Sequence, residues 1–163
     1  MAPTKPKIYI EMTVVSYFTA RPSRDLVIAG RQETTREVWP RLFEEFDPYI
    51  SALVLQEAGK GDAQAAKERL DAIQNLPVLD ISSPSSQTLA ALLVAQHGIP
   101  QEYAEDALHI AVATMHGLDI VLTWNFSHLN NPFTRLRIRR ILEQEGYQGP
   151  EICSPEELSG VTP

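Results

Sequence analysis

The chain has 163 residues, 44% of them hydrophobic, which suits one domain with a continuous core that needs no disulfide or zinc staples. Its single cysteine, Cys153, excludes an internal disulfide framework and favours a reducing compartment, and a lone thiol of this kind is expected to be a buried small hydrophobe. The net charge of -7 argues against a surface that coats nucleic acid broadly, although local basic patches are compatible with it. No run approaches the roughly 18 apolar residues that cross a bilayer, so a cytoplasmic protein without a membrane association is expected.

The first part of the chain predicts one strand and two helical segments. Residues 7–11 (KIYIE) alternate apolar side chains and predict a first strand after a disordered tail over residues 1–6. Residues 12–19 indicate a short helix or turn, and residues 25–46 a longer helix. Pro40 is expected to kink or divide that longer helix, because proline removes a backbone donor.

The middle of the chain alternates the two kinds of element. Residues 48–51 (PYIS) predict a second short strand, and residues 52–59 predict a helix that closes at glycine. An alanine-rich helix is predicted over residues 63–74. Residues 78–81 (VLDI) indicate a third strand, which a helix with apolar periodicity over residues 84–97 follows.

The last part of the chain continues the alternation. Residues 103–116 predict a helix, and residues 119–123 (DIVLT) form the most apolar strand candidate of the chain. A polar loop over residues 124–132 and a helix over residues 135–145 come next. Residues 150–153 are expected to add an edge strand.

This alternation predicts an α/β fold, a three-layer α/β/α sandwich in which helices cover both faces of a central parallel sheet. Ligands bind such doubly wound sheets beyond the carboxyl ends of the central strands, where the direction of winding reverses. Glu11 ends the first predicted strand, and Thr123 and Asn125 follow or end the fourth. These residues are expected to face one crevice.

Four oxygen-bearing side chains lie near the predicted strands, and together they suggest a site for a hard divalent cation that cleaves phosphodiesters. These residues are Glu11, Glu57, Asp106 and Asn125. The absence of a GxSxG motif disfavours a serine hydrolase, and the absence of glycine-rich phosphate loops disfavours a dinucleotide or P-loop enzyme.

The two glutamates each have a structural alternative. Glu11 is followed by Thr13, whose hydroxyl could orient the carboxylate or bind a metal-bound water, but a strand can also end on a solvated acid. Glu57 shares a helical face with Leu53 and is expected to point inward, where an acid needs a partner or a metal. The alternative for Glu57 is an exposed position beside Gln56.

Asp106 and Asn125 also have alternatives. Asp106 shares the apolar face of its helix with Ile110 and Ala113, which favours a metal role over simple complementation of the helix dipole. Asn125 offers an amide oxygen to a cation but carries no charge, and its structural role would be to form a turn.

The histidines do not form a zinc signature, since no HExxH motif or cysteine pair accompanies them. His109 and His116 are interpreted as packing or helix-end residues. His128 lies in the loop beside Asn125 and could contact a phosphate or a metal-bound water.

Arginines gather in two places that are both expected to border the crevice and to grip an RNA backbone. The first group follows the first strand, and the second group follows the fourth. They are Arg21 and Arg24, and then Arg135, Arg137, Arg139 and Arg140. A solvated helix face is the alternative for the second group.

Four segments in order, IYIEMTVVSYF, SALVLQEAGKG, AEDALHIAVATMHG and VLTWNFSHL, resemble the motif blocks of PIN-domain nucleases, most closely the VapC-like toxin ribonucleases of bacterial type II toxin–antitoxin systems. The resemblance runs from residue 7 to the final strand. Glu11 stands where family members typically have Asp, with Thr13 at the following hydroxyl position, and Glu57 and Asp106 match two further acids. Asn125 stands at the last acidic position, and His128 where many members have another Asp.

The resemblance implies a single PIN-like domain over residues 1–163 with flavodoxin-like winding, and an endoribonuclease that depends on Mg²⁺ or Mn²⁺. Glu11, Glu57 and Asp106 would hold the ion, with Asn125 completing or orienting its shell. Thr13, Arg21, Arg24 and His128 would contact the RNA substrate. A small antitoxin and a second copy of the chain are the implied protein partners.

Two departures from the family pattern keep other functions open, because Glu11 is one methylene longer than Asp and Asn125 lacks a charge. A catalytically weak PIN-like module that binds RNA or a protein is one alternative. A metal-dependent DNA nuclease or phosphatase that uses the same crevice is another. Three carboxylates suffice for one divalent ion, whereas a second ion would be held weakly.

Overall fold

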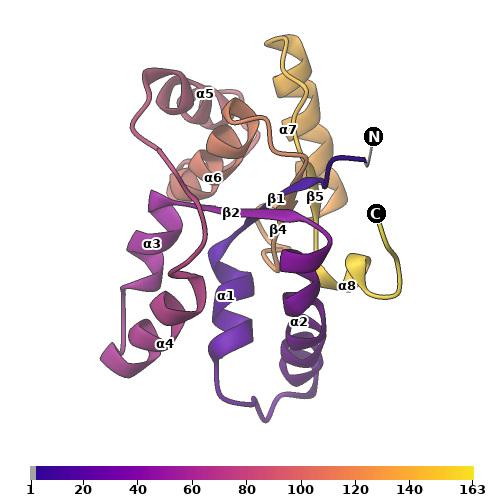
Figure 1. Ribbon diagram of the computed structural model, residues 1–163. Helices are drawn as coiled ribbons and strands as arrows, with labels where there is room; N and C mark the ends of the chain where they lie inside the picture. Colours follow the sequence, from indigo (N-terminus) through magenta and orange to yellow (C-terminus); the bar gives the residue numbers. More distant parts are fainter. Residues whose placement is uncertain (1–2) are drawn as a thin grey trace.

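The computed structural model describes residues 3–163 and has a central sheet of five parallel strands in the order β3-β2-β1-β4-β5. Helices cover both faces of the sheet (Figure 1). The predicted three-layer α/β fold is therefore confirmed. The strands are β1 (Lys7–Ile10), β2 (Asp47–Ser51), β3 (Val78–Leu79), β4 (Ile120–Leu122) and β5 (Glu151–Cys153).

Two groups of helices form the outer layers. Below the sheet in Figure 1 lie α1 (Met12–Thr19), α2 (Leu26–Glu44), α3 (Ala52–Ala58) and α4 (Ala63–Ile73). Above it lie α5 (Pro84–Ala95), α6 (Ala104–Met115) and α7 (Pro132–Gln144). The short 3-10 helix η1 (Gln101–Tyr103) leads into α6, and α8 (Pro155–Leu158) packs beside α2.

Strand β1 lies at the centre of the sheet and is covered on both faces. Its residues Ile8, Tyr9 and Ile10 have no exposed surface, as expected for a strand between two helical layers. The chain winds from β1 through β2 to β3, and then crosses to β4 on the other side of β1. The winding therefore reverses between β1 and β4, and a ligand site is expected at the carboxyl ends of these two strands.

Pro40 was expected to kink or divide its helix; α2 continues through it, so a division was wrong, while a kink stays a prediction. Proline removes the backbone bond to the carbonyl four residues earlier. Val38, Trp39 and Leu42 around it are buried, and we attribute the continuity of the helix to this packing.

Several predicted boundaries also differ from the structure. Helix α7 begins three residues earlier than expected because Asn131 caps it by accepting a bond from Thr134 N, with Pro132 in the first turn. The predicted disordered tail lies partly outside the described residues. Its last residue is attached to the sheet, since the Pro6 carbonyl accepts a bond from Asp47 N at 2.9 Å.

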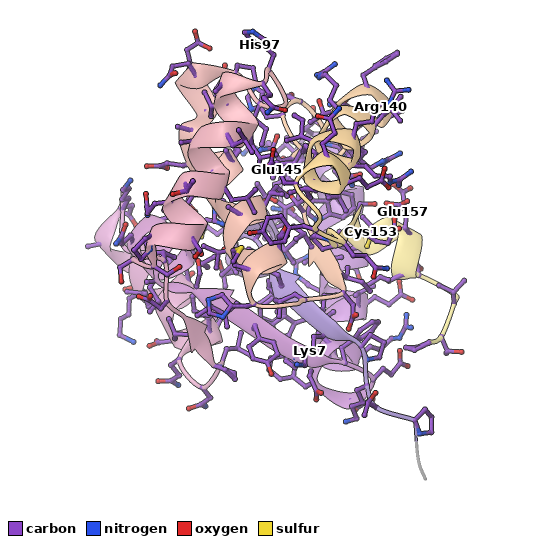
Figure 2. All side chains as sticks on the ribbon, turned by 90° about the horizontal axis from the view of Figure 1, so that it is seen from above. Lys7, His97, Arg140, Glu145, Cys153 and Glu157 are labelled. Atoms are coloured by element: carbon purple, nitrogen blue, oxygen red, sulfur yellow. The ribbon has the colours of Figure 1, made fainter. Side chains whose placement is uncertain are left out.

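A view from above shows residues of the upper helical layer and of the edge strand β5. Figure 2 looks down on the upper layer, with Arg140 on α7, Glu145 just after the end of this helix and Cys153 on β5. None of the helices within residues 3–163 is both long and apolar enough to cross a membrane.

Candidate functional site

Glu11 lies at the point where the winding of the sheet reverses. It follows β1 directly, and its backbone N–H donates to the Leu122 carbonyl at the end of β4 at 3.1 Å. The side chain is 3% exposed. Such a position is costly for a carboxylate unless several donors compensate for the lost water.

Hydroxyl and amide groups supply that compensation. Oε1 of Glu11 accepts bonds from Thr13 Oγ1 and Thr123 Oγ1, both at 2.6 Å, and Oε2 accepts one from Thr13 N at 3.0 Å. Glu11 is thereby the N-cap of α1. Thr13 Oγ1 in turn accepts from Trp124 N at 2.9 Å, which ties the loop after β4 to the start of α1. Thr13 thus orients the Glu11 carboxylate, which is one of the two roles that the sequence suggested for its hydroxyl.

Glu57 lies on α3, the helix that starts where β2 ends. Ser51 caps this helix, and its hydroxyl accepts a long bond from Val54 N at 3.4 Å. The Glu57 side chain is 21% exposed, and its Oε1 lies 2.7 Å from Nε2 of the fully buried His109. Glu57 therefore points toward the protein, and its partner is a histidine.

Asp106 lies in the first turn of α6 and is half-buried. Its Oδ2 accepts from the Asn125 side-chain amide at 3.2 Å and lies 3.4 Å from Nδ1 of His128. The Asn125 amide oxygen accepts from His128 N at 3.0 Å, so it closes the loop after β4. Asn125 therefore turns its nitrogen to the acid. This contact suits an orienting role for Asn125 better than a direct bond to a cation.

The ionisation of Asp106 reflects neighbours from several elements. Burial is the largest effect and raises the pKa of Asp106, and the nearby Glu11 carboxylate raises it as well. His109, the Asn125 amide and His128 act in the opposite direction. Hydrogen bonds link the two acids, since Thr123 Oγ1 donates to Glu11 and accepts from Asn125 N, and the Asn125 amide donates to Asp106.

His109 is buried on α6 and forms a hydrogen bond with Glu57. Burial opposes the charged form of its ring, but the hydrogen bond that the ring donates to Glu57 and the charges of Glu11, Glu57 and Asp106 together raise the pKa of His109. Of the three carboxylates, Glu57 contacts the buried imidazole directly, and Asp106 lies one turn before His109 on the same helix. The sequence interpretation of His109 as a packing residue was right about its burial and missed these polar contacts.

The donor chemistry of the three acids suits a hard divalent cation, since carboxylate oxygens are the ligands that Mg²⁺ and Mn²⁺ prefer. Within residues 3–163, Oε2 of Glu57 and Oδ1 of Asp106 receive no hydrogen bond from the protein, and Oε2 of Glu11 receives one. Each acid thus keeps an oxygen with a lone pair for a cation. The same residues contain no group of three or more His, Cys, Asp or Glu side chains placed closely enough to hold a metal as they stand. A cation would have to draw the three side chains together.

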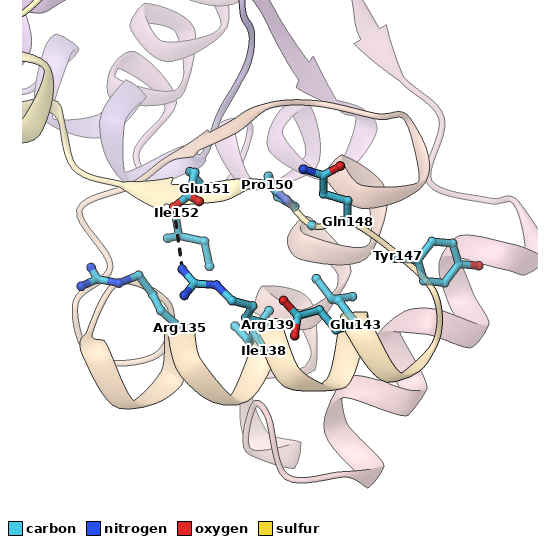
Figure 3. A pocket seen from close by; sticks show the side chains of 11 residues that line it. Arg135, Ile138, Arg139, Glu143, Tyr147, Gln148, Pro150, Glu151 and Ile152 are labelled. Atoms are coloured by element: carbon cyan, nitrogen blue, oxygen red, sulfur yellow. Dashed lines mark ion pairs between the residues drawn. The ribbon is translucent and has the colours of Figure 1, made fainter.

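One of the residues in the two arginine groups is placed differently from the expectation. Arg21 and Arg24 lie in the loop after α1, which puts the eight residues of that helix, about 12 Å of helix length, between them and Glu11. Arg139 pairs at 3.9 Å with Glu151, the first residue of β5, and so faces the amino edge of the sheet (Figure 3). The expectation was therefore wrong for Arg139, whereas a place for Arg21 and Arg24 beside the crevice stays a prediction. Helix α7, which carries Arg139, leads away from the carboxyl ends of the strands.

Arg31 on α2 is the cation that the sequence interpretation missed. Its guanidinium carbon lies 4.9 Å from the centre of the Phe126 ring and 5.6 Å from the centre of the Trp124 ring. These rings belong to the loop that carries Asn125 and His128. No local pattern around Arg31 identifies it, because the contact depends on how α2 packs beside the loop. In the sequence, only the aromatic residues of the WNF segment indicated that a cation could bind at this loop.

Tyr103 is a second feature that the sequence interpretation missed. Its ring stacks on His128 with the centroids 3.4 Å apart and an interplanar angle of 21°. His128 is thus held between a half-exposed aromatic ring and Asp106. The stack forms part of the rim of the candidate site.

Comparisons with known proteins identify the fold. A chain in the crystal structure of VapBC2 from Rickettsia felis, bound to a DNA fragment from their promoter, matches with a TM-score of 0.57 and 13% identity, covering 91% of this chain and 98% of that chain. A chain in the structure of DNA-bound VapBC from Salmonella typhimurium matches with a TM-score of 0.55 and 18% identity, covering 92% of this chain and 98% of that chain. The protein therefore has a PIN-like fold that it shares, over more than nine-tenths of its length, with chains of VapBC complexes. No family model and no curated protein matches the sequence.

Proposed function

We propose that this protein is an endoribonuclease that uses Mg²⁺ or Mn²⁺ and that Glu11, Glu57 and Asp106 provide its cation ligands. The observation that supports the proposal is a set of hydrogen bonds beside the carboxyl ends of β1 and β4. Thr123 Oγ1 and Asn125 link Glu11 to Asp106, and Glu57 bonds to His109 on the helix that carries Asp106. Excess negative charge in a partly buried region is stabilised when a divalent cation binds. The likeness to chains of VapBC complexes supports the same conclusion through the fold.

Each residue of the proposed site has its own role toward the cation. A bound cation would lower the pKa of its water and stabilise charge on the phosphate oxygens. Glu11 is held in place by two hydroxyls, so little of its side-chain freedom remains to be lost on binding. Asn125 orients Asp106 through its amide nitrogen.

Residues around the three acids would contact the RNA substrate. His128 lies beside Asp106 and could donate to a phosphate oxygen, while Arg31 brings a positive charge to the same loop. Arg21 and Arg24 would contact a more distant part of the RNA backbone. The exposed loop between α1 and α2 that carries them is compatible with such a contact.

A small antitoxin and a second copy of the chain are the protein partners that we propose. Both solved structures named above are VapBC assemblies bound to DNA. By analogy, this chain would be the toxin component of a type II toxin–antitoxin pair. Co-expression with the product of a small neighbouring reading frame, followed by size-exclusion chromatography, tests for both partners.

One observation favours a second candidate function, a PIN-like module that binds RNA or a protein with little catalysis. Asn125 faces Asp106 with a nitrogen where a further acid would add charge, and no three ligands converge within residues 3–163. A module of this kind would bind RNA equally well in the presence of a chelator. It would show no turnover.

Cleavage of RNA in the presence of Mn²⁺ tests the leading proposal. The native protein, Asp106→Asn and Asp119→Asn are compared, because Asp119 lies at the opposite edge of the sheet and accepts a bond from Lys7 N there. We expect loss of cleavage in Asp106→Asn alone, and loss in the native protein when a chelator is added. Equal cleavage by the native protein and Asp106→Asn would reject the proposal.

A further inference from the structure

A chain of buried polar groups connects the centre of the sheet to Glu57. Nε2 of His109 lies 2.7 Å from Glu57 Oε1, and Nδ1 of the same ring lies 2.5 Å from the Tyr9 hydroxyl. The Tyr9 hydroxyl also lies 2.7 Å from Ser51 Oγ. Tyr9, Ser51 and His109 have no exposed surface, so the chain is closed to solvent until it reaches Glu57.

The direction of these bonds follows from what each group can donate. Burial raises the pKa of Tyr9, so its hydroxyl keeps its proton and can donate it to Nδ1 of His109. Ser51 can then donate to the tyrosine oxygen, and Ser51 Oγ accepts from Val54 N. With Nδ1 occupied, Nε2 carries the ring proton and donates it to Glu57. A second proton on the ring leaves the donation to Glu57 unchanged.

The hydrogen bond from His109 to Glu57 Oε1 leaves the other carboxylate oxygen, Oε2, free. A glutamate has three rotatable bonds, and an unheld side chain on α3 would sample several rotamers. A bond from His109 to Oε1 selects those that leave Oε2 available. The ring cannot follow a moving carboxylate, because its Tyr9 contact and a T-shaped packing of the two rings hold it.

We propose that His109 is a positioning residue that holds Glu57 so that its Oε2 faces a divalent cation, with Tyr9 and Ser51 fixing the ring from behind. This inference rests on the proposed function, since it assigns a role toward the cation that the three carboxylates would bind. It explains why a histidine lies within the core of α6. Histidine can accept from one side and donate to the other, which an apolar residue cannot.

The test compares His109→Gln with His109→Met. The two replacements have similar lengths, but only glutamine can donate to Glu57. The Kd for Mn²⁺ is measured by electron paramagnetic resonance of free Mn²⁺. We expect it to rise about tenfold or more in His109→Met and to stay within about threefold of native in His109→Gln. His116→Met is the control, because His116 is exposed at the end of the same helix.

RNA cleavage supplies a second readout that a purely structural role would not produce. At low Mn²⁺ the kcat of His109→Met should fall, and rising Mn²⁺ should restore it, while the KM for RNA stays unchanged. Circular dichroism melting checks that each variant is folded. If His109→Met does not fold, Tyr9→Phe replaces it, because it keeps the ring and removes its partner, and we expect its Kd for Mn²⁺ to rise about threefold or more.

The outcomes separate this inference from the function on which it rests. A native Kd for Mn²⁺ in folded His109→Met, or in Tyr9→Phe where it replaces that variant, overturns the positioning role and leaves the proposed nuclease intact. Absence of Mn²⁺ binding by the native protein overturns both. Weaker binding in His109→Met together with rescue by glutamine supports the inference.

Discussion

Thr123 Oγ1 donates a hydrogen bond to Glu11 Oε1 at 2.6 Å, and this contact joins the ends of the two strands between which the winding reverses. Thr123 is fully buried, and its hydroxyl also accepts from Asn125 N at 2.9 Å. The Thr123 hydroxyl thus binds both the Glu11 carboxylate and the backbone of the loop that carries Asn125. Its removal should affect both the stability of the protein and the site.

Replacement of Thr123 by valine tests this double role. Valine keeps the shape but leaves Glu11 with one donor fewer and Asn125 N without its acceptor. We expect the free energy of unfolding to fall by about 1–3 kcal/mol. Urea denaturation measures the change, and Thr123→Ser, which keeps the hydroxyl, should lose less. A native stability in Thr123→Val would contradict the importance of this bond.

Thr35 on α2 holds the loop after β4 from the other side. The indole N–H of buried Trp124 donates to Thr35 Oγ1 at 2.8 Å. Thr35→Val should leave that N–H unpaired and lower the free energy of unfolding by about 1–3 kcal/mol, whereas Thr35→Ser should be milder. The Trp124 fluorescence spectrum should also shift in the valine variant. Identical unfolding curves for the two variants would show that the bond is unimportant.

Gly149 closes the hollow between α7 and β5 that Figure 3 shows, a cavity of about 370 Å³. A Cβ atom at this position would lie 2.3 Å from Leu142 Cδ1. Because Leu142 is buried, Gly149→Ala should displace it and destabilise the protein by about 1–3 kcal/mol. Gly30→Ala is the matched control. It lies within α2 with nothing near its Cβ position, so it should stabilise the protein by about 0.5–1 kcal/mol.

Cys153 should be an unreactive thiol at neutral pH. Burial, and then the charges of Glu157 and Glu151, raise its pKa to about 12. The thiolate that reacts with disulfide reagents is therefore scarce at pH 8 in the folded protein. Ellman's reagent should modify Cys153 slowly in buffer and rapidly in denaturant. Fast modification of the folded protein would contradict this account.

The raised pKa of Cys153 also predicts how the free energy of unfolding changes with pH in the alkaline range. The unfolded thiol loses its proton at a lower pH than the folded thiol, so the unfolded state binds fewer protons between these two pKa values. The contribution of Cys153 is fully present below the unfolded pKa. It is lost as pH rises toward about 12.

The layers of this fold could be predicted from the sequence because the signals are local. Strand patterns such as KIYIE and DIVLT alternate with helical periodicity, and this alternation leads to a parallel sheet. The position of Glu11 beside the end of β4 follows from the same rule for winding. The inward direction of Glu57 also followed from its helical spacing.

The contacts that depend on tertiary packing could not be predicted in this way. His109 lies three residues after Asp106, yet nothing in that spacing indicates Tyr9 as its partner, since Tyr9 is 100 residues away in the chain. Arg31 reaches Trp124 only because α2 packs beside the loop. Arg139 was misplaced because α7 runs back toward the amino edge of the sheet.

Whether Glu11, Glu57 and Asp106 form a cation site can be decided by measuring Mn²⁺ binding to the protein without RNA. Electron paramagnetic resonance of free Mn²⁺ can be measured for the native chain, for Glu11→Gln and Asp106→Asn, and for Asp119→Asn as the control at the other edge. We expect one ion per native chain, binding at least about tenfold weaker in the first two variants, and native binding in the control. Native affinity in Glu11→Gln and Asp106→Asn, or no binding by the native protein at millimolar Mn²⁺, would contradict this expectation.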